Sequence, residues 1–141
     1  MRIKQAQLVK APRERVFEAW TDYEAYPKWD GKVFTRVTVT HRAGNTASLD
    51  METRFMGMTM PRKERHVLTP PEKVEVDGSV PIAGNTTVWT FEDVPGGTLL
   101  TAVLEVQFRG MLGILSPLAR WQARSMLSNW MQAFANYVEA T

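Results

Sequence analysis

Residues 116–140 read SPLARWQARSMLSNWMQAFANYVEA, and apolar side chains recur along this stretch with the period of an α-helix. A helix of this length is roughly 30–35 Å long, enough to cross a whole sheet. Its opposite face carries polar side chains such as Gln122, Ser128 and Gln132. The sequence therefore predicts a long helix that covers another layer with one apolar stripe. That stripe consists of Ala119, Ala123, Met126, Leu127, Trp130, Phe134, Tyr137 and Val138.

The residues before this helix alternate between apolar and polar side chains, which is typical of half-buried strands. In residues 46–55, for example, Leu49 and Met51 share one face while Asp50 and Glu52 share the other. Successive hairpins of this kind predict an α+β fold with a curved antiparallel sheet of about seven strands. Strands are predicted at residues 3–9, 33–40, 46–55, 59–68, 73–77, 84–94 and 98–108, and two short helices at 12–20 and 23–29, after the first strand.

The composition is that of an ordinary globular chain. Its 141 residues are 44% hydrophobic and 23% charged, so we expect a single domain over residues 1–141. A net charge of +2 without a dense basic tract argues against a nucleic-acid partner. The absence of cysteine excludes disulfides and thiolate chemistry. No secretory signal or membrane-spanning run is visible, which favours a cytoplasmic location.

Five short motifs occur in order along the chain: Ala11-Pro12-Arg13-Glu14-Arg15-Val16-Phe17, Asp22-Tyr23-Glu24-Ala25-Tyr26-Pro27-Lys28-Trp29, Pro70-Pro71, Trp89-Thr90-Phe91 and Gly110-Met111-Leu112-Gly113. In these motifs the sequence resembles the START-like (helix-grip, SRPBCC) superfamily, and most of all the polyketide cyclase/dehydrase and lipid transport family. The stretch Tyr26-Pro27-Lys28-Trp29 is also similar to the coenzyme Q-binding branch of the superfamily. The resemblance implies a helix-grip fold over essentially the whole chain. It implies little about chemistry, because this fold hosts carriers, receptors and cyclases alike.

The predicted fourth strand has charged side chains on both faces. We expect the face with Arg62, Glu64 and His66 to point toward the helix, because Met60 and Leu68 flank it. Charged groups there must be paired, hydrated or close to a ligand, since an unpaired buried charge is costly. The alternative is an edge portion of strand whose charges are solvated on both faces.

Only two histidines are present, His41 and His66, and the sequence predicts neither a metal site nor a cofactor. His66 beside Glu64 is a candidate acid/base pair, because imidazole titrates near neutral pH. The alternative for His66 is a hydrogen-bonded structural histidine. His41 lies near a turn and is not a candidate.

The helix stripe begins with small residues, which predicts a cavity under its first half. Its bulkier end is expected to fill the core. A cavity of this kind is mostly apolar, with a few polar groups that orient the ligand. The predicted ligand-binding residues are Leu49, Met51, Phe55, Arg62, Glu64, His66, Trp89, Phe91, Ala102, Leu104, Ala119, Ala123, Met126, Leu127 and Trp130.

Three functions remain open at this point. The first is binding or transport of a small hydrophobic ligand, such as a lipid, an isoprenoid or a polyketide-like aromatic. The second is a cyclase or dehydratase that uses His66 or Glu64 as acid/base. The third is an interaction module that makes transient membrane or protein contacts through the apolar segments 56–60 and 110–115. In the alternative, these two segments form a flexible mouth through which the ligand enters the cavity. For Trp121 and Leu118 we expect that they cover residues 111–115. Oligomeric state is left open.

Overall fold

The computed structural model describes residues 1–55, 57–81, 83–108 and 116–141. Each predicted helix and strand is present, and its ends differ from the prediction by a few residues at most. The elements in chain order are β1 (Arg2–Val9), α1 (Arg13–Thr21), the short 3-10 helix η1 (Tyr23–Ala25), α2 (Tyr26–Trp29), β2 (Phe34–Ala43), β3 (Thr46–Phe55), β4 (Met58–Thr69), β5 (Lys73–Val80), β6 (Ala83–Val94), β7 (Gly97–Phe108) and α3 (Ser116–Ala140).

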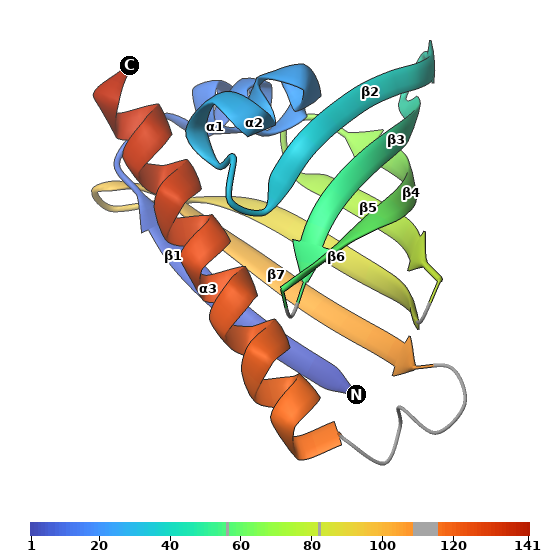
Figure 1. The fold of residues 1–141 in the computed structure, drawn as a ribbon. Coiled ribbons are helices and arrows are strands. Elements are labelled where there is room, and N and C mark those ends of the chain that lie inside the picture. Colours follow the sequence, from blue (N-terminus) through green and yellow to red (C-terminus); the bar gives the residue numbers. More distant parts are fainter. Residues whose placement is uncertain (56, 82, 109–115) are drawn as a thin grey trace.

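The seven strands form one antiparallel sheet in the order β1-β7-β6-β5-β4-β3-β2. The sheet is strongly curved, and α3 runs across its concave side next to β1 (Figure 1). Helices α1 and α2 lie at the end of the sheet that the C-terminal end of α3 reaches. They are placed between this end of α3 and β2 (Figure 1). This arrangement confirms the predicted α+β helix-grip fold. Among the described residues no helix is long and apolar enough to cross a bilayer.

The second half of α3 supplies much of the hydrophobic core. Phe134 is fully buried, and its ring stacks on that of Trp130 with the centroids 5.5 Å apart. Trp29 of α2 packs against both rings, and the ring of Tyr137 stacks on that of Trp29. The bulky end of the helix stripe therefore packs into the core, as expected, and the first half of α3 lies over the other end of the sheet.

Two close approaches join the start of the chain to distant elements. A Cβ atom on Gly97 would collide with the backbone oxygen of Val9, so the β6–β7 turn requires glycine where it passes β1. At the C-terminal end of α3, Nη2 of Arg15 donates to the carbonyl oxygen of Val138 at 2.6 Å and to Oγ1 of Thr141 at 2.7 Å. The connection from β4 to β5 contains a cis peptide bond between Pro70 and Pro71.

Candidate functional site

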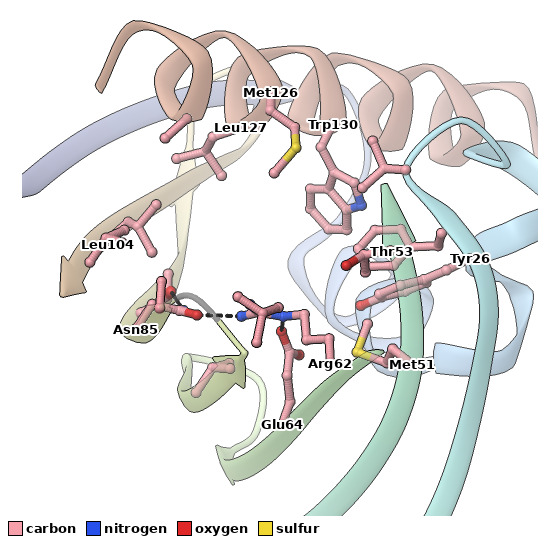
Figure 2. Close-up of a pocket in the computed structure, with 18 of the residues that line it drawn as sticks. Tyr26, Met51, Thr53, Arg62, Glu64, Asn85, Leu104, Met126, Leu127 and Trp130 are labelled. Atoms are coloured by element: carbon pink, nitrogen blue, oxygen red, sulfur yellow. Dashed lines mark hydrogen bonds and ion pairs between the residues drawn. The ribbon is translucent and has the colours of Figure 1, made fainter. Parts of the chain in front are cut away.

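A cavity of about 200 Å³ lies between the concave face of the sheet and the first half of α3. Figure 2 shows Met126, Leu127 and Trp130 of α3 on one wall and Arg62, Glu64 and Asn85 of the sheet on the opposite wall. Most of the lining is apolar. The cavity therefore has one polar wall in otherwise apolar surroundings, as ligand pockets generally do.

The structure brings ten of the predicted ligand-binding residues together around this cavity. The helix contributes four of them, and β3, β4, β6 and β7 contribute the others. The ten residues are Met51, Arg62, Glu64, His66, Trp89, Leu104, Ala123, Met126, Leu127 and Trp130.

Three predicted residues lie in the core and are not part of the cavity lining: Leu49, Phe91 and Ala102. They are on the expected face of their strands, but closer to the end of the sheet that the short helices cover. The ring of Phe91, for example, lies 5.0 Å from that of Phe17 in α1, which fills the space above it. The side chains of the remaining two, Phe55 and Ala119, are outside the described part of the structure.

Several lining residues were missed by the sequence analysis. Asn85 and Thr87 could have been found, because they precede Trp89 at intervals of two on β6 and therefore share its face. Thr53 follows Met51 on β3 in the same way. Trp20 and Tyr26 could not have been found, because they reach the cavity from helices whose docking depends on tertiary packing.

The predicted inward face of β4 is confirmed. Met60, His66 and Leu68 are buried, Arg62 and Glu64 are mostly buried, and the alternate residues are exposed. In the β3–β4 hairpin, Met60 lines the cavity and Met58 is 53% exposed. Met56 and residues 110–115, the rest of the proposed mouth, lie outside the described residues. Trp121 is 63% exposed and Leu118 is exposed as well.

Five polar side chains of the cavity lining form a continuous hydrogen-bonded chain that extends to Tyr23. Nε of Arg62 donates to Oε2 of Glu64 at 2.5 Å, and Nη2 of Arg62 donates to Oδ1 of Asn85 at 2.5 Å. Oε1 of Glu64 lies 2.7 Å from Nε2 of His66, whose Nδ1 lies 3.0 Å from the Tyr23 hydroxyl. Nδ2 of Asn85 donates to Oγ1 of Thr87 at 3.1 Å. We call Arg62, Glu64, His66, Asn85 and Thr87 the polar cluster.

The hydrogen bonds assign roles within the polar cluster. Burial alone would raise the pKa of the Glu64 carboxyl, but the charge of Arg62 and the contact with His66 outweigh it and lower the pKa to about 2. Glu64 is therefore an ionised acceptor at neutral pH, and Nε2 of His66 donates to it. Burial raises the pKa of the Tyr23 hydroxyl, which stays protonated and lies 3.0 Å from Nδ1 of His66.

Three hydrogen-bond donors of the lining remain without a partner among the described residues. Nη1 of Arg62 is in none of the hydrogen bonds that the guanidinium makes. Nε1 of Trp20 and Nε1 of Trp130 are buried and unpaired. Of these three donors, Nη1 of Arg62 is the one that an acceptor group on a bound molecule could reach, because the two indole nitrogens have almost no accessible surface.

The antiparallel sheet, the long helix across it and the cavity between them define a START-like, helix-grip domain. The sequence over residues 9–135 matches the family model of polyketide cyclase/dehydrase and lipid transport proteins, and the chain belongs to this family. No sequence match was found among curated proteins.

Solved structures show the same fold at low sequence identity. TTHA0849 from Thermus thermophilus has a TM-score of 0.89 and 16% identity, covering 99% of this chain and 98% of that one. The Zhui aromatase/cyclase from a Streptomyces species has a TM-score of 0.83 and 15% identity, covering 99% and 93%. A START superfamily protein from Mycobacterium smegmatis has a TM-score of 0.82 and 18% identity, covering 99% and 97%. At these identities the likeness concerns the fold alone.

Proposed function

We propose that this protein binds, and in that sense carries, a small and mostly apolar molecule in the cavity between α3 and the sheet. The observation that carries the proposal is the pairing of an apolar lining with a single polar wall. Ligand pockets of proteins generally measure about 300–1,000 Å³. A cavity of about 200 Å³ favours a ligand of one or two rings or a short isoprenoid over a long lipid chain.

The state of the polar cluster favours binding over acid–base catalysis. A catalytic base works best when its pKa is near the working pH, and a carboxyl with a pKa of about 2 is a weak base at neutral pH. Both ring nitrogens of His66 already have hydrogen-bond partners, Glu64 and Tyr23. His66 therefore fits its alternative reading, a structural histidine that orients Glu64.

The proposal is tested first by native mass spectrometry of the protein purified from its own host, which should reveal a co-purified apolar compound. A second test is titration with 2-ethylnaphthalene, followed through the fluorescence of the tryptophans that line the cavity. We expect Ala123→Trp to fill the cavity and weaken binding at least about tenfold. Arg124→Trp, at the next and exposed position of α3, is the matched control and should bind like the wild type.

Thermal unfolding of both variants shows whether Ala123→Trp still folds. Wild-type binding that persists unchanged in a folded Ala123→Trp variant would place the ligand elsewhere and overturn the proposal. Vesicle or protein binding that survives this substitution would favour the interaction module instead.

A further inference from the structure

We propose that the cavity selects neutral molecules that carry a hydrogen-bond acceptor, such as a ketone or ester carbonyl, and discriminates against carboxylates. This inference rests on the proposed function and names the ligand class for the same cavity. Its basis is the way in which the sheet holds the Arg62 side chain.

The guanidinium of Arg62 lies over a position in β5 where the sheet has no side chain. Glu64 of β4 pairs with Gly78 of β5, and Gly78 pairs with Asn85 of β6. Arg62 extends across this row from Glu64 to Asn85 (Figure 2). A Cβ atom on Gly78 would collide with Nη2 of Arg62 and lie 2.9 Å from Oδ1 of Asn85. The missing side chain at Gly78 therefore leaves the space in which the guanidinium lies close against the sheet.

The charge of Arg62 is already balanced. Arg62 and Glu64 both line the cavity and form an ion pair at 2.5 Å. A carboxylate entering the cavity would lose its hydration, meet a guanidinium whose charge Glu64 already compensates, and lie close to the Glu64 carboxylate. A neutral acceptor brings no charge to desolvate.

A free donor on Arg62 makes an acceptor favourable. Nη1 of Arg62 has no hydrogen-bond partner among the described residues. A carbonyl oxygen near Arg62 would accept a charge-assisted hydrogen bond, which is stronger than one from a neutral donor. A purely apolar ligand would offer Nη1 of Arg62 no hydrogen bond.

Three ligands of similar size test this selectivity in the wild-type protein: 2-ethylnaphthalene, 2-acetylnaphthalene and 2-naphthoate, each titrated at pH 7. We expect 2-acetylnaphthalene to bind about tenfold more tightly than 2-ethylnaphthalene, and 2-naphthoate at least about tenfold more weakly than 2-acetylnaphthalene. Equal or tighter binding of 2-naphthoate would overturn the proposal. This series needs no variant, so its outcome does not depend on the folding of a mutant.

Glu64→Gln tests the charge balance directly. The substitution keeps the shape of the side chain but leaves the positive charge of Arg62 uncompensated. We expect the affinity for 2-naphthoate to rise at least about tenfold relative to the wild type, so that the preference for 2-acetylnaphthalene is reduced or reversed. A folded Glu64→Gln variant that still rejects 2-naphthoate as strongly as the wild type would contradict the proposal.

Gly78→Ala tests the position of the guanidinium. The added methyl group must displace Arg62, so the preference for 2-acetylnaphthalene over 2-ethylnaphthalene should fall to about twofold or less. Gly84→Ala is the matched control in the neighbouring strand, because its Cβ would have ordinary contacts and nothing nearer than 3.9 Å. A Gly78→Ala variant that keeps the full preference would overturn the role given to Arg62.

The two proposals fail in different ways. If none of the three ligands binds the wild type, the binding function itself is wrong. If 2-ethylnaphthalene binds and the acetyl group adds nothing, only the selectivity for a neutral acceptor is wrong.

Discussion

Oε1 of Glu64 lies 2.7 Å from Nε2 of His66, two residues along the same inward face of β4. Burial alone would raise the pKa of the Glu64 carboxyl, but the charge of Arg62 and this contact lower it from 4.5 to about 2. A carboxyl with a depressed pKa in the folded state stabilises that state above its unfolded pKa, and the contribution is lost as the pH falls toward the folded value. For Glu64 the affected range is from about pH 4.5 to about pH 2.

We predict that Glu64→Gln lowers the free energy of unfolding at pH 7 by about 3 kcal/mol. This value combines the loss of the favourable interactions that lower the pKa of Glu64 with the cost of leaving Arg62 unpaired. Urea unfolding of both proteins at pH 7, 4.5, 3 and 2 measures the effect. The difference in the free energy of unfolding between wild type and variant should shrink as the pH falls, because the protonated Glu64 carboxyl resembles the glutamine amide. A difference that stays constant down to pH 2 would contradict this account of Glu64.

The stacked pair in the core gives a prediction about stability. Phe134 is 0% exposed and packs against both Trp130 and Trp29. Phe134→Ala should lower the free energy of unfolding by about 3–5 kcal/mol, through lost burial and the cavity left behind. Trp121→Ala, on the exposed side of the same helix, should change it by less than about 0.5 kcal/mol. Chemical denaturation of both variants is the measurement, and similar losses in the two would place the core elsewhere.

Two neighbouring glycines in the β6–β7 turn allow the cost of backbone strain to be compared with the cost of a steric collision. Gly96 and Gly97 both have positive φ angles, 92° and 149°. A Cβ atom on Gly96 meets nothing within 4 Å, whereas one on Gly97 meets the backbone oxygen of Val9. We expect Gly96→Ala to cost about 1–2 kcal/mol from strain and Gly97→Ala to be clearly more destabilising. Thermal unfolding of both variants tests this order, and equal losses would show that β1 yields to the methyl group.

The end of α3 depends on a cation from another helix. Arg15 donates to the carbonyl of Val138 and to the hydroxyl of Thr141, which itself donates to the same carbonyl. Its positive charge therefore lies at the C-terminal end of the helix, where a cation is favourable. Arg15→Gln should lower stability by about 1 kcal/mol and speed amide hydrogen exchange in the last turn of α3. Glu14→Gln, at the neighbouring position of α1, is the control. Unchanged exchange in Arg15→Gln would show that the contact is not formed in solution.

The fold could be predicted from the sequence because it follows from periodicity. Alternation in residues 46–55 and 98–108, and the 3.6-residue period after Ser116, determine which faces are apolar and how the two layers combine. The inward face of β4 could be predicted too, because Met60 and Leu68 flank charged residues whose own pattern is ambiguous.

The candidate site could be predicted only in part, because periodicity gives the face of a strand and not the depth at which a residue lies. Leu49, Phe91 and Ala102 point to the correct side, but packing against other elements places them in the core. Trp20 and Tyr26 enter the cavity from helices whose position over the sheet has no periodic signal. The position of the Arg62 guanidinium depends on the missing side chain at Gly78. This role of Gly78 can be seen only once the strand register is known.

The pairing of β1 with β7 joins residues about a hundred positions apart, such as Ile3 with Leu104. Contacts so distant in sequence form slowly, and domains dominated by them fold in about milliseconds to seconds. Until β1 docks, β7 is an unpaired edge that can recruit a strand from another chain. A molecule that occupies the cavity binds the folded chain and not the unfolded one, so it also reduces the time that this edge spends unpaired.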